Sequence, residues 1–187
     1  MKNFTYTVLA AIAVAVIQGC ASPAAIDQMT LQTGDFVETA NEPLKDTVRI
    51  DEVTGGKSTN PLWTSQVSSE DYRSALENSL KLAGYLGNGD DSEKYLLSAS
   101  LMELKQPLLG INMTVTCKTQ YRLVDTRQGK EIYNKIIETP YTATFSDSAI
   151  GMTRLKIANE RAVRENIKAL VADLSTLNVP LATVVFE

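Results

Sequence analysis

The sequence predicts an α+β domain: a mostly antiparallel β-sheet with two amphipathic helices packed on one of its faces. The first observation is a strict alternation of apolar and polar residues from Ile111 to Leu123, which is typical of a strand with one buried and one solvated face. The second is a pair of segments, 69–83 and 149–177, whose apolar residues recur at helical spacing. The predicted order is β-α-β-β-β-α, with a possible last strand at 181–186, and both helical stripes then share one core.

The domain is predicted to begin with a strand near Thr47 that ends at Gly55-Gly56. A helix follows, with Ser68 as its cap, Asp71 at capping-box spacing, and Gly84 as its end. Its buried stripe consists of residues three or four positions apart: Tyr72, Ala75, Leu76, Leu80 and Ala83.

Three strands are predicted after this helix. The first covers 95–101, and a break at Gln106–Gly110 separates it from the alternating strand that begins at Ile111. The turn-rich segment 125–130 then predicts a hairpin whose return strand runs from 131 to 145. Within that return strand Pro140 indicates a bulge or an edge position, because proline cannot donate to a sheet ladder.

The second helix is expected to take Asp147 or Ser148 as its cap. Its opposite side carries Glu160/Arg164 and Arg161/Glu165, which we expect to be solvent-facing ion pairs. Its buried stripe is predicted to contain Met152, Leu155, Ala162, Val163, Ile167, Leu170, Val171 and Leu174.

An apolar run from Val8 to Ile17 ends just before Gly19-Cys20. The run is too short to span about 30 Å of hydrocarbon, but it has the length of a signal-peptide core. The tetrapeptide Ile17-Gln18-Gly19-Cys20 resembles a bacterial lipobox, which implies that residues 1–19 are removed and that Cys20 is acylated. The alternative is an ordinary signal peptide cleaved near Ala21 or Ala24, in which Cys20 has no special role.

Three segments follow from this interpretation: a signal peptide at 1–19, a lipidated Cys20 with a flexible tether at 20–46, and one periplasmic α+β domain at 47–187. The tether is predicted because 21–46 is rich in small and polar residues and has no sustained period, and partial docking of this segment on the domain is left open. By resemblance to Gram-negative lipoproteins, Ala21 after the cysteine favours an outer-membrane location that faces the periplasm.

Composition excludes several function classes. The chain has no histidine, which removes histidine-dependent triads and general acid–base catalysis as well as most zinc sites. Removal of Lys2 with the leader leaves 17 basic and 22 acidic residues, a balance that argues against nucleic acid and against an anionic membrane surface as main partners. Once Cys20 is acylated, Cys117 has no partner for a disulfide, and its place in the alternating strand predicts a buried thiol rather than a reactive one.

Two motifs resemble ligand sites only in part. Thr54-Gly55-Gly56-Lys57-Ser58 ends like a phosphate-binding loop, but the required earlier glycine is replaced by Asp51, so a glycine turn is the favoured interpretation. The carboxylates of Asp90, Asp91 and Glu93 lack the spacing of a calcium loop and predict a solvated connection. We therefore expect no metal site and no cofactor.

Two surfaces are candidates for partner contact. One is the segment Asn60, Pro61, Leu62 and Trp63, which holds the only tryptophan, although such a tryptophan is more often an anchor at the edge of a core. The other is the polar face of the sheet, whose small and polar side chains could line a groove, together with a free edge strand that could accept a partner strand. On the alternating strand this face carries Asn112, Thr114, Thr116, Lys118, Gln120 and Arg122.

Several motifs together resemble a family of small Gram-negative envelope lipoproteins. They are the lipobox, Thr54-Gly55-Gly56, Asn60-Pro61-Leu62-Trp63, Ala75-Leu76-x-x-Ser79-Leu80-x-x-Ala83-Gly84 and Ala158-Asn159-Glu160-x-Ala162-Val163-Arg164-x-Asn166-Ile167. The layout is also similar, at the level of the fold, to outer-membrane assembly lipoproteins such as the lipopolysaccharide-transport lipoprotein. No motif in the resemblance is catalytic, and a fold alone does not transfer function.

The resulting expectation is a non-catalytic envelope lipoprotein that is held on the outer membrane by acylated Cys20 and binds or assembles an envelope protein partner. One alternative is a lipid- or glycan-binding lipoprotein that uses the space between sheet and helices. A second alternative is an envelope hydrolase or transferase based on carboxylates, although no pair of Asp or Glu residues stands out.

Overall fold

The computed structural model describes residues 22–35, 40–59, 66–89 and 94–179 of the 187-residue chain. One layer is a four-stranded sheet in the order β1-β2-β3-β4, in which β1 is parallel to β2 and the other pairs are antiparallel. The strands are β1 (Val48–Thr54), β2 (Tyr95–Lys105), β3 (Met113–Asp125) and β4 (Lys130–Ala143), and the helical elements are α2 (Ile26–Met29), η2 (Glu42–Leu44), α3 (Ser69–Leu82) and α4 (Gly151–Thr176). This order confirms the predicted fold class.

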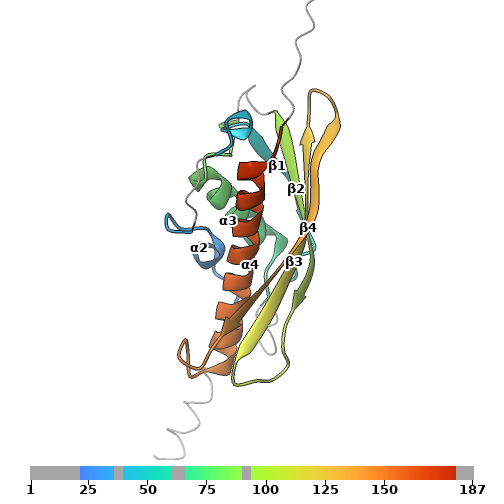
Figure 1. Cartoon of the computed structure of the whole chain (residues 1–187). Coiled ribbons are helices and arrows are strands. Elements are labelled where there is room, and N and C mark those ends of the chain that lie inside the picture. The colour runs from blue at the N-terminus through green and yellow to red at the C-terminus, as the bar shows by residue number, and fades with distance from the viewer. Residues whose placement is uncertain (1–21, 36–39, 60–65, 90–93, 180–187) are drawn as a thin grey trace, which may run out of the picture.

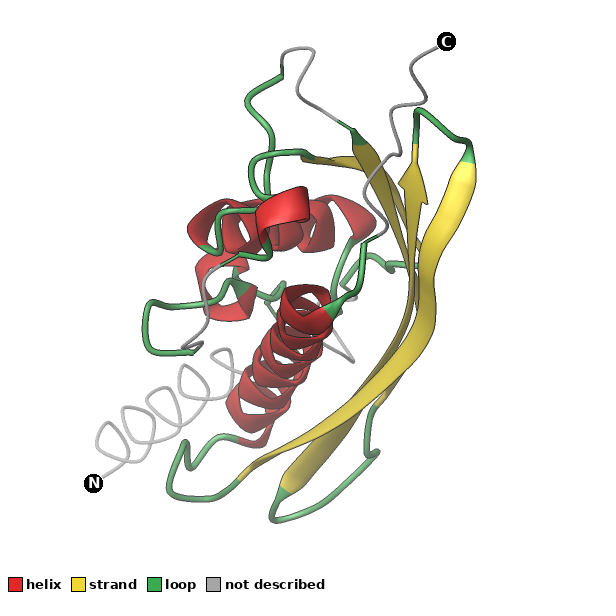
Figure 2. Cartoon of the chain, turned by 45° about the horizontal axis from the view of Figure 1, so that its top comes forward, coloured by secondary structure: helices red, strands yellow, loops and turns green. Residues whose placement is uncertain are grey.

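All the helices lie on one face of the sheet (Figure 1). Helix α4 runs along β3 and β4, α3 packs against β1, and the sheet curves around α4 (Figure 2). The core between the layers is filled by fully buried side chains, among them Leu97, Leu123, Ile167, Leu170 and Leu174. The space in which we expected a lipid or glycan ligand is therefore occupied by the protein's own core.

Strand β3 shows the predicted alternation. Val115, Cys117 and Tyr121 are completely buried, whereas Thr114 and Arg122 on the other face are exposed. The strand begins at Met113, however, and Ile111 is 76% exposed, so the predicted start at Ile111 is wrong. Pro140 pairs with Thr116 without a register shift, on a strand whose other edge is unpaired among the described strands, which favours the edge position over a bulge.

The described residues before β1 are packed on the domain. Met29, Leu31 and Leu44 are at most 2% exposed, and the Leu31 amide donates to Ser79 Oγ on α3 at 3.0 Å. Residues 22–35 and 40–46 therefore belong to the folded unit, in contrast to the flexible tether expected for 20–46. Their apolar residues follow no period because each fills a separate gap beside α3 or α4. The sequence pattern therefore gives no sign that these residues are buried.

The two long helices differ at their N-termini. Ser68 caps α3 as predicted, because its Oγ accepts a hydrogen bond from the Asp71 amide at 3.0 Å. Helix α4 begins after Ile150 without a side-chain cap, so the predicted cap at Asp147 or Ser148 is wrong. Asp147 instead accepts from the Thr144 amide at 2.6 Å and stabilises the preceding turn.

The second side of α4 is buried rather than solvated. Glu160 is 4% and Arg164 is 2% exposed, so the expected surface pair is wrong. Glu160 Oε1 accepts from the Ala25 amide at 2.7 Å and lies 3.8 Å from Lys156 Nζ, because the N-terminal segment covers this side of the helix. Burial raises the pKa of Glu160, against the opposing effects of the Ala25 amide and Lys156.

A polar network crosses the core between the helices and the sheet. Asn166 on α4 donates to the carbonyl oxygens of Cys117 (3.2 Å) and Ile137 (3.0 Å), and its Oδ1 accepts from Tyr121 Oη at 2.9 Å. Tyr121 Oη in turn contacts Tyr72 Oη of α3. Burial raises the pKa of both tyrosines, so they remain neutral hydrogen-bonding groups. The network thereby joins α3, α4, β3 and β4 through buried polar side chains.

Candidate functional site

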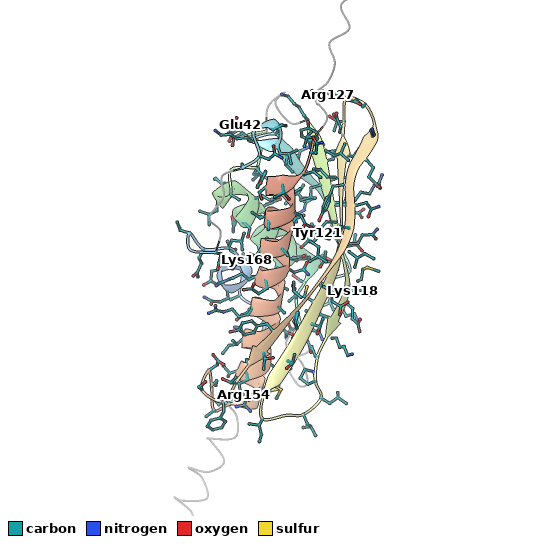
Figure 3. All side chains as sticks on the ribbon, viewed as in Figure 1. Glu42, Lys118, Tyr121, Arg127, Arg154 and Lys168 are labelled. Atoms are coloured by element: carbon teal, nitrogen blue, oxygen red, sulfur yellow. The ribbon has the colours of Figure 1, made fainter. Side chains whose placement is uncertain are left out.

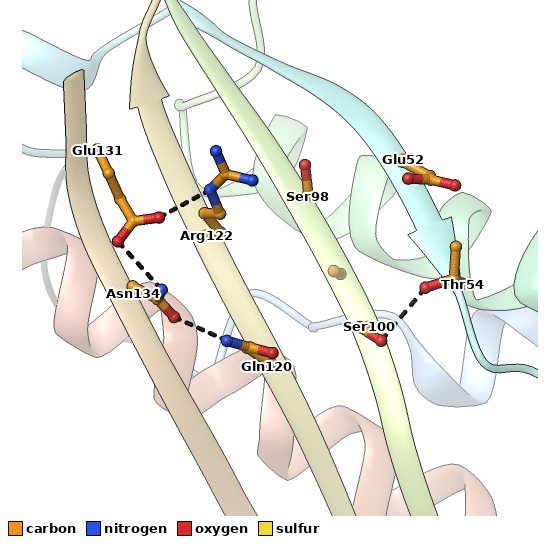
Figure 4. A pocket seen from close by; sticks show the side chains of 9 residues that line it. Glu52, Thr54, Ser98, Ser100, Gln120, Arg122, Glu131 and Asn134 are labelled. Carbon is orange, nitrogen blue, oxygen red and sulfur yellow. Dashed lines mark hydrogen bonds and ion pairs between the residues drawn. The ribbon is translucent and has the colours of Figure 1, made fainter. Parts of the chain in front are cut away.

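The open face of the sheet carries a shallow polar depression of about 360 Å³ (Figure 4). No helix among the described elements covers this face (Figure 2). All four strands contribute to the depression, and its lining residues are Glu52, Thr54, Ser98, Ala99, Ser100, Gln120, Arg122, Glu131 and Asn134.

The depression exists because the central strand β2 carries small residues where its neighbours carry long ones. Ser98 and Ser100 lie on β2 and pair with Arg122 and Gln120 of β3. Because side chains alternate between the faces of a strand, the residues that alternate with these serines, Leu97, Ala99 and Leu101, are buried in the core. The floor is therefore low at β2, and the longer side chains of β3 and β4 form one wall.

A chain of hydrogen bonds orders this wall. Gln120 Nε2 donates to Asn134 Oδ1 at 3.0 Å, and Asn134 Nδ2 donates to Glu131 Oε1 at 3.0 Å. Glu131 Oε2 then lies 2.7 Å from Arg122 Nε. The two terminal nitrogens of the Arg122 guanidinium have no hydrogen-bond partner among the described residues, so they are available to a ligand.

The opposite wall is shorter and also polar. Thr54 Oγ1 donates to Ser100 Oγ at 3.2 Å, and Glu52 lies on the same strand β1 (Figure 4). The depression thus combines guanidinium and amide donors with hydroxyl and carboxylate acceptors in a solvated setting. Such a surface can bind a polar chain or a hydroxyl-rich molecule. Within the part of the chain that the structure describes, no three acidic or thiol groups are clustered closely enough to hold a metal ion.

The first two predicted sites lie outside the described residues. These are Cys20, the predicted lipidation site, and the segment Asn60, Pro61, Leu62 and Trp63. The residues flanking the second segment are joined, because the Gln66 amide donates to Thr59 Oγ1 at 2.9 Å and Thr59 Oγ1 donates to the Gln66 carbonyl. Asp90, Asp91 and Glu93 and the possible strand at 181–186 also lie outside the described residues.

The glycine pair after β1 has a structural explanation. Gly55 adopts a φ of +83°, and a Cβ at this position would lie 2.0 Å from the Leu101 carbonyl oxygen. A Cβ on Gly56 would lie 2.1 Å from the Ser69 amide nitrogen. Both positions require glycine because two backbone segments approach closely. This supports the predicted turn and removes the need for a phosphate-binding interpretation.

Cys117 is the buried thiol that the strand pattern predicts. It is fully buried, its sulfur lies 3.7 Å from Thr119 Oγ1, and no disulfide involves it. Burial raises the pKa of the Cys117 thiol to about 12. The group is therefore protonated at neutral pH and unsuited to nucleophilic chemistry.

Sequence reasoning identified only part of the depression. It placed Gln120 and Arg122 on the polar face of β3, but it missed the contributions of Ser98, Ser100 and Glu131. The signal for the serines was present, because the alternation over 95–101 leaves both of them on the face opposite the core. The contact between Glu131 and Arg122 depends on the register of β3 with β4, and the sequence does not specify this register.

Comparison with known proteins establishes the fold alone. No protein-family model matches the sequence, and no curated protein is significantly similar to it. The fold is shared with protein XCC0632 of Xanthomonas campestris, of family DUF330: the TM-score is 0.51 at 9% identity, over 74% of this chain and 91% of that one.

Two further solved structures give TM-scores below 0.5. A candidate lipoprotein from Caulobacter crescentus gives 0.47 at 18% identity over 68% of this chain and 88% of that one. A minor lipoprotein from Acinetobacter baumannii gives 0.45 at 11% identity over 71% and 93%.

Proposed function

We propose that this protein is a non-catalytic lipoprotein of the cell envelope, anchored to the outer membrane by acylated Cys20, and that it binds an envelope protein through the open face of its sheet. The observation that carries the proposal is the asymmetry of the sheet. One face is buried under the helices, whereas the other presents an ordered polar depression that is exposed to solvent.

The anchor is supported by the leader sequence. The apolar run that ends at Ile17 and the small residue Gly19 before Cys20 match the pattern that a lipoprotein signal peptidase requires. In the described part of the chain, no helix is long and apolar enough to cross a bilayer. Two or more acyl chains on Cys20 would provide stable attachment, because each buried methylene contributes about 0.8 kcal/mol.

The binding role is supported by the chemistry of the depression. The terminal nitrogens of Arg122 point away from its ion pair with Glu131 and can form a charge-assisted hydrogen bond to a carboxylate or carbonyl of a partner. Arginine is enriched at the energetic centres of protein interfaces. The ordered wall of Gln120 and Asn134 reduces the loss of side-chain freedom on binding.

A non-catalytic role agrees with the groups that line the depression. The Ser100 hydroxyl bonds to Thr54, and the Ser98 hydroxyl approaches Asp51 Oδ2 only at 3.5 Å. The chain has no histidine to serve as the base of a nucleophilic serine. The carboxylates of Glu52 and Glu131 are on exposed residues, in contrast to the buried acid that a glycosidase uses.

The proposal is tested by cross-linking in cells that produce the full chain, followed by identification of the captured partner. We expect one partner protein with the native chain and with Lys118→Ala, which alters the same face outside the depression. We expect Arg122→Ala to lose at least four fifths of that product, because it removes the charged donor.

A Cys20→Ala chain serves as the test of the anchor. It should leave the membrane fraction and lose the partner, and mass spectrometry of the native N-terminal peptide should show a diacyl or triacyl cysteine. If Arg122→Ala and Lys118→Ala capture the partner equally well, the open face is not its binding surface.

An oligosaccharide ligand is a second candidate, favoured by the neutral hydroxyl and amide groups of the depression. Thr54, Ser98, Ser100, Gln120 and Asn134 offer paired donors and acceptors like those that bind sugar hydroxyls. Titration of the mature chain with soluble peptidoglycan fragments, followed by NMR, would show shifts confined to these residues if this candidate is correct. Absence of shifts at millimolar fragment would remove it.

A further inference from the structure

One end of the molecule exposes a cluster of large apolar side chains. They lie on two loops, the β2–β3 loop and the β4–α4 loop, which meet because Met113 at the start of β3 pairs with Ala143 at the end of β4. The exposed fractions are 97% for Leu108, 91% for Leu109, 76% for Ile111, 59% for Phe145 and 53% for Ile150. We call these five residues the apolar tip.

The loops of the apolar tip are held in place by the domain. Gln106 Nε2 donates to Asn159 Oδ1 of α4 at 2.9 Å, and Arg154 Nη1 donates to the Ser148 carbonyl at 2.6 Å. The Arg154 guanidinium also lies over the Phe145 ring, 5.5 Å from its centroid. An apolar hollow of about 370 Å³ lies between the β2–β3 loop, Met113 and the start of α4. The exposure is therefore a feature of fixed loops. Residues 106–113 carry no charge, and the one charged residue in the loop 144–150 is the exposed Asp147, which accepts hydrogen bonds from Thr144.

The opposite end of the sheet is polar. The β3–β4 turn there contains Arg127 and Gln128 and is followed by Lys130 at the start of β4. Figure 3 shows Arg127 and Arg154 at opposite ends of the molecule. Arg127 is paired with Asp125 at 2.9 Å. The molecule thus has one apolar end and one charged end, and an exposed apolar patch of this kind marks a contact with a partner or a membrane.

The position of the anchor favours a membrane over a protein partner as the contact of the apolar tip. The chain is attached to the domain at Ala24 and Ala25. Ala24 is 5% exposed and its amide donates to the Gln66 carbonyl at 3.3 Å, and the Ala25 amide donates to Glu160 on α4 at 2.7 Å. Four residue steps lead from Cys20 to Ala24, and a fully extended chain of four steps reaches about 14 Å. Glu160 lies nine residues from Gly151 at the apolar end of α4, or about 14 Å, and sixteen residues from Thr176 at the other end, or about 24 Å. An anchor on Cys20 can therefore reach the level of the apolar tip but cannot reach that of the charged end.

We propose that the apolar tip inserts into the surface of the bilayer to which Cys20 is attached, and that this second contact fixes the orientation of the domain. This inference rests on the proposed lipid anchor. A single tether leaves a domain free to rotate, whereas a second apolar contact restricts it and holds the charged end away from the lipid. The open face of the sheet then stands roughly upright on the membrane, where a partner protein can reach it.

The test couples the mature chain through the Cys20 thiol to a maleimide phospholipid in vesicles of phosphatidylethanolamine and phosphatidylglycerol. This coupling supplies the tether whether or not cells acylate Cys20, and buried Cys117 does not compete for the maleimide. Leu109→Trp reports on the apolar tip and Gln128→Trp on the charged end, each compared with the parent chain, which keeps Trp63. We expect Leu109→Trp fluorescence to shift to the blue and to be quenched about twofold by brominated lipid chains, because a tryptophan at this depth lies among acyl carbons.

Gln128→Trp should show neither change. Equal, parent-like fluorescence of both variants on tethered vesicles would overturn the proposal. A blue shift of Leu109→Trp that depends on protein concentration in the absence of vesicles would also overturn it and would assign the apolar tip to a contact between copies. If the tip inserts on these vesicles but native Cys20 carries no acyl chain, the proposed anchor fails while the lipid affinity of the tip stands.

Discussion

The two faces of the sheet use polar side chains in opposite ways. On the helix-covered face, the polar atoms of Asn166 and Tyr121 find partners inside the core. On the open face, Arg122 uses one guanidinium nitrogen for Glu131, and its terminal nitrogens have no partner among the described residues. Both faces are built by the same strands with the same alternation of side chains. The polar side chains behave differently because helices cover one face and solvent covers the other.

The comparison separates stability from function. A buried polar group must be satisfied within the protein, because an unpaired one costs about 1–3 kcal/mol. An exposed group is satisfied by water and can exchange that water for a ligand. Substitutions on the covered face should therefore destabilise the fold, whereas substitutions on the open face should change binding alone.

The largest difference between the faces is expected in thiol reactivity. Burial raises the pKa of Cys117 from 9.0 to about 12, which lowers the thiolate fraction about a thousandfold at pH 8. In a Cys20→Ser chain, a chromogenic disulfide reagent should leave Cys117 unmodified until denaturant is added. Ser100→Cys in the same chain adds a thiol on the open face that should react within minutes. Rapid reaction of Cys117 in the native chain would show that the covered face opens readily.

The next largest effect is expected at Asn166. Asn166→Ala removes the acceptor of the Tyr121 hydroxyl and the side-chain donor to two strand carbonyls, and we expect a loss of about 3 kcal/mol in the free energy of unfolding. Asn134→Ala is the matched control on the open face and should cost less than about 0.5 kcal/mol, as exposed substitutions do. Urea denaturation of both variants measures the difference. Equal losses would contradict the distinction between the faces.

Glu160 tests the packing of the N-terminal segment on α4. Glu160→Ala removes the acceptor of the Ala25 amide, and we expect a loss of about 1–2 kcal/mol. Burial raises the folded-state pKa of Glu160 above its ordinary value of 4.5, so the native chain binds more protons than the unfolded chain in the window just above pH 4.5. The contribution of Glu160 to stability is therefore largest below that pH and decreases as pH rises through the folded-state pKa.

Glu160→Gln keeps an acceptor for the Ala25 amide but cannot ionise, so this part of the pH dependence should disappear. Glu138→Gln, on the open face with a side chain that is 59% exposed, should retain it. Urea titrations at several pH values between 4 and 7 give the free energy of unfolding of each variant, and the slopes of this free energy against pH are compared. If the free energy of unfolding of Glu160→Gln changes with pH as it does in the parent chain, another group causes the pH dependence.

The smallest effect on stability is expected at Arg122. Arg122→Ala removes one ion pair between exposed side chains, and such a pair contributes at most about 1 kcal/mol. The melting temperature should therefore change by only a few degrees. Lys118→Ala, which breaks a longer 4.0 Å pair on the same face, is the reference. A strongly destabilised Arg122→Ala chain would mean that the open face supports the fold rather than binding.

The elements were predictable where a pattern repeats. The alternation along β3 and the stripe of α4 gave both layers of the fold and located Cys117 in the core, because periodic burial is recorded locally in the sequence. The N-terminal residues Met29 and Leu31 were missed, since isolated apolar residues that fill tertiary gaps have no period. Asn166 was missed as a core residue because only the packed helix shows which polar atoms it reaches.

The candidate site was predictable only in outline. Gln120 and Arg122 follow from the polar half of an alternation, but their neighbours Glu131 and Asn134 depend on the register of β3 with β4. The apolar tip was partly misread, because Ile111 continues the apolar alternation of β3 although the strand begins only at Met113. A sequence pattern does not show where a partner strand stops.

The most direct measurement of the central claim is site-specific photocross-linking in cells. A benzoylphenylalanine is placed at Asn134, on the wall of the depression, or at Asn78, an equally exposed asparagine on α3 on the opposite side of the molecule. Binding through the open face predicts one discrete cross-linked protein from position 134 and none from position 78, with the product lost in Cys20→Ala cells. Cross-linking from position 78 but not from position 134 would contradict it.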